Sequence, residues 1–167
     1  MNNLKETLII VGITVLVFMG IIWIATPSGK SPAEAGTEQL ISSSLVAPET
    51  KYDFGTISMA DGKVTHLFTF KNIGTDPVTI TTTYTSCMCT AITLIIDGER
   101  KGPFGMPGHG FLPKLNELIP AGAEVRAEVV FDPASHGPAG VGPIARSVIL
   151  ETSSGKAEMS FSAVVTP

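Results

Sequence analysis

The feature of this 167-residue chain that most constrains its fold is a series of short segments in which apolar and polar residues alternate. The segments begin near residue 51 and are separated by Gly, Pro, Asn and Asp, which favour turns. Alternation with a period of two places apolar side chains on one face of a strand, where they can form half of a core. The pattern predicts an all-β fold, an antiparallel β-sandwich of about seven strands.

Seven strands are expected from this alternation. Phe68 and Phe70 would share one face of their strand, as would Val129 and Phe131 on another, and these faces should form the core. A stretch rich in Gly and Pro, residues 97–118, interrupts the series and is predicted to be a long loop, and such loops are often functional. The predicted strands cover residues 51–53, 64–71, 78–83, 89–96, 124–131, 147–151 and 158–165.

The N-terminal part contains an apolar run over residues 8–25 that carries no charge. At about 1.5 Å per residue, a helix of this length nearly crosses the hydrocarbon core of a bilayer, and Trp23 would lie at its interface. A cleaved signal peptide ending near residues 33–35 is the alternative, although its apolar region is usually shorter. The predicted organisation is a short segment over 1–7, a transmembrane helix over 8–25, a flexible linker over 26–44 and a β-sandwich domain over 45–167.

Whether this run is a transmembrane helix or a cleaved signal peptide, the domain that follows it is expected to be exported. The predicted location is therefore the cell membrane, crossed once, with the C-terminal domain on the extracytoplasmic side. The net charge is −4 and no run of Lys or Arg is present, so a nucleic-acid partner is not expected. No enzymatic activity is predicted, because the chain shows neither a nucleophile elbow nor a recognised pair of acid and base.

Several motifs resemble a known family. They are Phe54-Gly55-Thr56-Ile57, the segment from Phe68 to Gly74, the Cys-Met-Cys-Thr motif at 87–90, and Pro120-Ala121-Gly122 before a strand. Together they resemble the bacterial domain of unknown function 1573, which is related to the Hydin and major-sperm-protein domains. The resemblance covers about residues 46–165 and implies an immunoglobulin-like β-sandwich, but no activity, because a fold does not determine a function. Met88 stands where the family usually has Gly, and the 97–118 insertion is longer than in the family.

Cys87 and Cys89 are the only cysteines, and they are expected at the start of a strand, where both sulfurs would project to the same face. A disulfide between positions i and i+2 of an extended strand is geometrically unfavourable and easily reduced. Free thiols in an exported protein need protection from oxidation, and metal ligation would supply it.

Imidazoles that could complete such a site lie on two predicted loops. His109 belongs to the long loop and His136 to a glycine-rich turn. Two thiolates with two imidazoles suit zinc, and Met106 as an additional thioether would favour a copper ion. The predicted function is extracytoplasmic binding of copper, or alternatively zinc, through Cys87, Cys89, His109, His136 and Met106.

Two other functions fit the same residues. The domain could be a structural or interaction module that docks a partner protein of the cell envelope, with the cysteines merely packed in the core. It could also be a thiol-redox protein whose two cysteines form a reversible disulfide. His66 is left out of the site, because it shares a face with Phe68 and Phe70 and is expected to be a hydrogen-bonded histidine at the edge of the sandwich.

Overall fold

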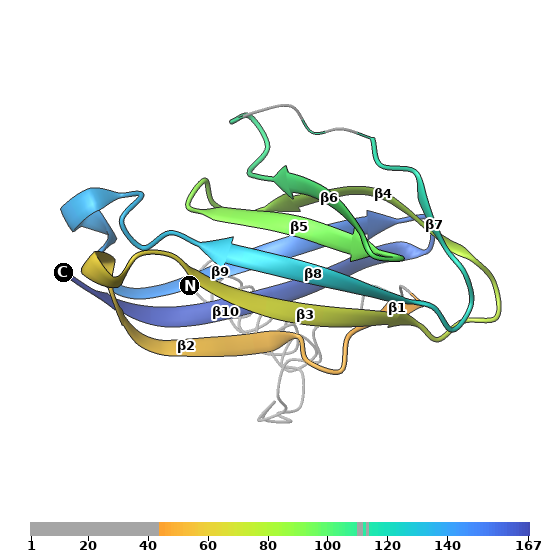
Figure 1. Ribbon diagram of the computed structural model, residues 1–167, viewed down its shortest axis with the longest axis horizontal. Helices are drawn as coiled ribbons and strands as arrows, with labels where there is room; N and C mark the ends of the chain where they lie inside the picture. Colours follow the sequence, from red (N-terminus) through yellow and green to blue (C-terminus); the bar gives the residue numbers. More distant parts are fainter. Residues whose placement is uncertain (1–43, 110–111, 113) are drawn as a thin grey trace, which may run out of the picture. The chain divides into compact units, whose positions relative to one another are not determined.

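The computed structural model describes residues 44–109, 112 and 114–167. These residues form ten strands and two short 3-10 turns (Figure 1). In chain order the elements are β1 (Leu45–Val46), β2 (Lys51–Ser58), η1 (Met59–Asp61), β3 (Val64–Asn72), β4 (Val78–Thr85), β5 (Thr90–Ile96), β6 (Glu99–Phe104), β7 (Glu117–Ile119), β8 (Glu124–Phe131), η2 (Gly137–Gly140), β9 (Gly142–Thr152) and β10 (Gly155–Thr166).

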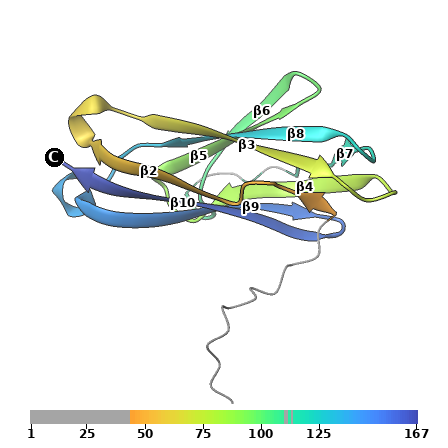
Figure 2. The ribbon, with the colours of Figure 1, turned by 90° about the horizontal axis from the view of Figure 1, so that it is seen from below.

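The strands build two five-stranded sheets that lie face to face (Figure 2). The first sheet has the order β1-β3-β8-β5-β6 and the second has the order β2-β10-β9-β4-β7. The predicted all-β sandwich is therefore confirmed. Among the described strands, β2 and β10 pair in parallel, so the expectation of a purely antiparallel arrangement is wrong for this one pair.

The core lies between the sheets and follows the predicted alternation. Phe68 and Phe70 on β3 and Val129 and Phe131 on β8 are all buried, as expected from their spacing. Phe161 of β10 packs against Phe131 across the sandwich, with ring centroids 5.4 Å apart. Each such side chain contributes about 1.5–3 kcal/mol when it leaves water.

The seven predicted strands are all present, several of them longer than expected, but the prediction of one long loop over 97–118 is wrong. That segment contains β6 and β7, which pair with β5 and β4. Asp97 and Gly98 both have positive φ and join β5 to β6 as a two-residue hairpin loop. The alternation missed β6 because only its last residue, Phe104, is buried, although an Asp-Gly pair is a strong hairpin signal.

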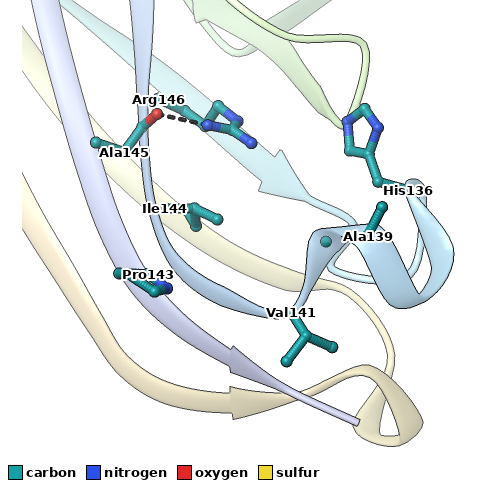
Figure 3. Close-up of a pocket in the computed structure, with 8 residues that line it drawn as sticks. His136, Ala139, Val141, Pro143, Ile144, Ala145 and Arg146 are labelled. Atoms are coloured by element: carbon teal, nitrogen blue, oxygen red, sulfur yellow. Dashed lines mark hydrogen bonds between the residues drawn. The ribbon is translucent and has the colours of Figure 1, made fainter.

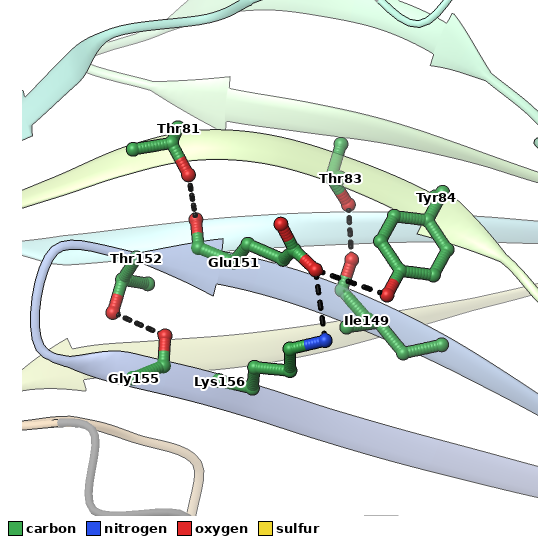
Figure 4. A network of polar contacts seen from close by, with 8 residues as sticks. All are labelled: Thr81, Thr83, Tyr84, Ile149, Glu151, Thr152, Gly155 and Lys156. Atoms are coloured by element: carbon green, nitrogen blue, oxygen red, sulfur yellow. Dashed lines mark hydrogen bonds and ion pairs between the residues drawn. The ribbon is translucent and has the colours of Figure 1, made fainter.

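Side-chain hydrogen bonds join β4 to β9 near the centre of the second sheet (Figure 4). The Thr83 hydroxyl donates to the Ile149 carbonyl at 2.9 Å, and the Thr81 hydroxyl donates to the Glu151 carbonyl. The Glu151 carboxylate contacts the Lys156 ammonium at 2.9 Å and accepts from the Tyr84 hydroxyl. The hydrogen bond from Lys156 lowers the pKa of Glu151 below its ordinary value.

The predicted transmembrane helix and nearly all of the predicted linker lie outside the described residues. Within the part of the chain that the structure describes, no helix has the length and apolar character needed to span a membrane.

Candidate functional site

Cys87 and Cys89 lie in the turn that carries the chain from β4 in the second sheet to β5 in the first. The Thr90 N–H donates to the Cys87 carbonyl at 3.1 Å and closes this turn. The prediction that Cys89 starts a strand is wrong, because β5 begins at Thr90. The turn brings the Cα atoms of the two cysteines to 5.3 Å, whereas an extended strand would hold them about 6.6 Å apart.

The two sulfurs are joined as a disulfide. Cys89 is buried, with 3% of its surface exposed, and Cys87 is only partly buried. The Thr85 hydroxyl donates to the Cys87 carbonyl at 2.9 Å, which fixes the start of the turn from the last residue of β4. Cys87 is therefore the more exposed residue of the pair.

A histidine and an arginine contact the two sulfurs from other parts of the fold. The His136 Nε2 lies 3.3 Å from the Cys87 Sγ, and the Arg146 Nε donates to the Cys89 Sγ at 3.4 Å. His136 belongs to the connection between β8 and β9, and Arg146 lies on β9. The Asp132 N–H donates to the Cys89 carbonyl at 2.9 Å, which ties this connection to the cysteine turn.

The surroundings of the disulfide favour negative charge on sulfur. A guanidinium and an imidazole beside a thiol stabilise the thiolate, the reactive form of cysteine. The carboxylate of Asp132, whose N–H binds the Cys89 carbonyl, is engaged elsewhere, since it lies 3.7 Å from the Lys63 ammonium and accepts the Ala134 N–H. Reduction of the disulfide would therefore leave the two sulfurs beside a guanidinium and an imidazole.

Three of the predicted metal ligands come together. The donor atoms of Cys87, Cys89 and His136 all lie within 4.8 Å of one another. His109 is exposed and is not a member of this group. Its N–H donates to the Met106 carbonyl at 3.2 Å, and Met106 follows Gly105, whose carbonyl accepts from the Thr85 N–H.

Arg146 is the residue that the sequence interpretation missed. Val148 and Leu150 on the same strand are buried, so a residue two positions before Val148 must point toward the same interior face. An arginine that continues the alternation of Val148 and Leu150 was the available signal. The separate interpretation of His66 agrees with the structure, because its Nε2 lies 2.9 Å from the Glu49 carboxylate and its ring stacks on Tyr52.

A shallow pocket of about 360 Å³ lies beside the cysteine turn (Figure 3). One wall is the η2 connection, and the other is the beginning of β9. His136 and Arg146, which contact the disulfide sulfurs, both line this pocket. Its lining includes His136, Val141, Pro143, Ile144, Ala145 and Arg146.

Comparison with solved structures finds several chains that are similar at low sequence identity. A secreted serine protease, VesC, from Vibrio cholerae is 16% identical, with a TM-score of 0.46 over 74% of this chain and 24% of that chain. A protein of unknown function from Porphyromonas gingivalis W83 is 16% identical, with a TM-score of 0.49 over 72% of this chain and 46% of that chain. The ASH / PapD-like domain 7 of human CEP192 is 11% identical, with a TM-score of 0.43 over 83% of this chain and 98% of that chain.

The chain thus spans less than half of the first two of these solved chains. No curated protein matches it. A family model does match residues 45–100, which include both cysteines, and this confirms the resemblance for that part of the chain. The description of that family, to which residues 45–100 are similar, is "Protein of unknown function (DUF1573)".

Proposed function

We propose that this protein is a non-enzymatic thiol-redox module whose Cys87–Cys89 pair alternates between a disulfide and a dithiol. One observation carries the proposal: each sulfur of the pair has its own polar partner, an imidazole at 3.3 Å for Cys87 and a guanidinium at 3.4 Å for Cys89. Cysteines that only pack in a core are surrounded by apolar groups and are inert. The chemistry proposed for the pair is exchange with an external thiol.

The difference in burial between Cys87 and Cys89 sets the direction of this exchange. An incoming thiolate attacks the Sγ of Cys87, the more exposed residue, the bond to Cys89 breaks, and Cys89 leaves as a thiolate beside Arg146. A second thiol of the same partner then attacks the mixed disulfide and releases Cys87 as a thiolate. The partner dithiol is oxidised to a disulfide, the Cys87–Cys89 pair gains two electrons, and the two protons of the partner pass to the pair or to solvent.

A redox titration tests this function. Purified protein is equilibrated with glutathione at graded ratios of thiol to disulfide, quenched with an alkylating reagent and analysed by mass spectrometry. The expected result is a reversible two-electron transition between an unlabelled form and a form with two labels. If the native, folded protein keeps the same labelling state over the whole range of ratios, the redox function is wrong.

The second candidate is a soft-metal site in the reduced protein, as the sequence suggests. It is supported by the three donor atoms of Cys87, Cys89 and His136 within 4.8 Å, a set that suits copper(I), with zinc as the alternative. The ligands must be deprotonated and the disulfide reduced, so binding requires the dithiol form. His109 and Met106, although expected as ligands, contribute no donor atom to the group of three.

Metal binding by the reduced protein distinguishes a site formed by Cys87, Cys89 and His136 from one that also uses His109. Copper(I) affinity is measured by competition with a chromophoric chelator for the native protein, His136→Ala and His109→Ala. A metal site at the cysteine turn predicts a loss of at least tenfold for His136→Ala and no change for His109→Ala. Equal affinities of all three proteins, or no binding by the reduced native protein, contradict this candidate.

We further propose that the domain works outside the cytoplasm, held at the cell membrane by residues 8–25. The apolar run and a disulfide, which persists in oxidising compartments, both support this location. Membrane fractionation of the full chain and of a chain without residues 8–25 tests this location. The full chain is expected in the membrane fraction, and the shortened chain is expected in the soluble fraction.

If both the redox titration and the metal assay fail, a partner-docking module of the cell envelope is the remaining function.

A further inference from the structure

Strand β9 is longer than its neighbour β4 at the end of the sandwich that carries the cysteines. The pairing of β4 with β9 ends at Thr85 and Val148, whereas β9 begins at Gly142. Residues 142–146 of β9 pair with β10 on one side only, because the chain after Ser86 turns away toward the other sheet. A short open edge therefore lies inside the second sheet, directly beside the cysteine turn.

The hydrogen-bond pattern shows which groups this edge presents. The Ser147 carbonyl accepts from the Ser86 N–H at 2.9 Å, so the backbone groups of Ser147 point to the β4 side. Its partner on β10, Ser160, donates its N–H to Thr50, away from β9. Since backbone groups alternate in direction along an antiparallel strand, Ala145 also directs its N–H and carbonyl to the open side.

Ala145 is exposed and lines the pocket. Its carbonyl accepts from the Arg146 Nη1 at 2.8 Å, which uses one of the two lone pairs of the oxygen (Figure 3). The N–H of Ala145 and the second lone pair can therefore bond to an added strand. Pro143 closes the edge beyond Ala145, because proline has no N–H to offer.

We propose that this edge, together with the pocket, docks an extended, acidic, cysteine-bearing segment of a partner protein. The segment would pair with β9 at Ala145 and present its thiolate to Cys87, whose neighbour Ser86 is already bonded to the same edge. The pocket lining contains His136 and Arg146 and no carboxylate, which favours an anionic segment. Backbone pairing at a sheet edge accepts any extended sequence, so the thiol and the charge supply selectivity.

This inference rests on the proposed redox function and names the class of its substrate. In the exchange, the thiolate of the docked segment forms a bond to the Cys87 Sγ while the bond between Cys87 and Cys89 breaks, and the electron pair leaves on the Cys89 sulfur beside Arg146. The segment proton has already passed to solvent. The product is a mixed disulfide between partner and protein.

The test compares two substitutions at one exposed position. Ala145→Pro removes the N–H that faces the open side without removing a bond to β10, and Ala145→Val keeps that N–H. The probes are a short acidic peptide of β-branched residues with one cysteine, the same peptide N-methylated at alternate residues, and 2-mercaptoethanol. The rate of mixed-disulfide formation at Cys87 is followed by mass spectrometry, and the melting temperature of each variant is checked.

Docking predicts that Ala145→Pro slows exchange with the peptide about tenfold relative to Ala145→Val and leaves 2-mercaptoethanol unaffected. It also predicts that N-methylation slows the peptide by a similar factor on the native protein, a comparison that needs no variant. Equal rates for the two peptides on the native protein overturn the docking edge while leaving the redox function intact. If 2-mercaptoethanol itself fails to open the native disulfide, the redox function fails and the docking inference falls with it.

Discussion

Substitution of Arg146 by methionine tests the electrostatic part of the site most directly. Methionine keeps a flexible apolar side chain of comparable length but removes the charge that lies 3.4 Å from the Cys89 Sγ. The disulfide is neutral, whereas the reduced pair carries a thiolate, so the guanidinium stabilises the reduced state more than the disulfide. The substitution should therefore shift the equilibrium toward the disulfide.

The size of this shift follows from the distance. Two unit charges 3.4 Å apart interact by about 1.2 kcal/mol even when screened as in bulk water. Arg146 is half-buried, so the effective screening is weaker than in bulk water and this value is a lower bound. We expect the equilibrium constant for oxidation by glutathione disulfide to rise at least about sevenfold in Arg146→Met.

The assay is the glutathione titration at two pH values, with Arg100→Met as the matched control. Arg100 contacts Glu128 on the outer face of the first sheet, away from the cysteines. The effect of Arg146→Met should be large near pH 8.5 and should shrink at pH 6, because a protonated thiol gains little from a nearby cation. A change below twofold, or an equal change in Arg100→Met, would refute the assignment of Arg146 to the thiolate.

Three further outcomes are expected. Cys89→Ser should trap glutathione as a mixed disulfide at least tenfold faster than Cys87→Ser, measured by mass spectrometry, because Cys87 is the more exposed residue; equal rates would contradict attack at that sulfur. Asn72→Ala should lower the free energy of unfolding in urea by about 2–4 kcal/mol, since the buried amide donates to two backbone carbonyls; a loss below 1 kcal/mol would contradict this. The folded-state pKa of Glu151 is depressed by the hydrogen bond from Lys156, so its contribution to stability is present above its ordinary value of 4.5 and is lost as the pH falls through the depressed value. Glu151→Gln should therefore lose less stability in acid than the native protein, and parallel pH profiles of unfolding would contradict it.

The strands could be predicted because their signal is local. Phe68 and Phe70 are two positions apart, and the pleat alone places both on one face, whatever the rest of the chain does. The Asp97-Gly98 hairpin could also have been predicted from the sequence, because an Asp-Gly pair favours a two-residue turn with positive φ at both positions. The alternation overlooked it because β6 lies at the edge of its sheet and buries little.

The site could be predicted only in part. Cys87 and Cys89 are neighbours in sequence, so their pairing needs no tertiary information, but the turn that joins them depends on the crossing from one sheet to the other. His136 and His109 look alike in the sequence, each in a stretch rich in glycine. Only the packing of the connection after β8 against the cysteine turn brings His136 and not His109 to the sulfurs.

The sequence by itself determined the strand pattern, the apolar run near the N-terminus and the cysteine pair, because each depends on residues a few positions apart. The tertiary structure alone decided that an imidazole 49 positions from Cys87 and a guanidinium 57 positions from Cys89 reach the same disulfide. It also decided that β9 extends beyond β4 and leaves an unpaired strand edge beside that disulfide. These contacts and this edge depend on how the two sheets stack and on which connections cross at one end of the sandwich. The alternation of apolar and polar residues along each strand does not encode that stacking.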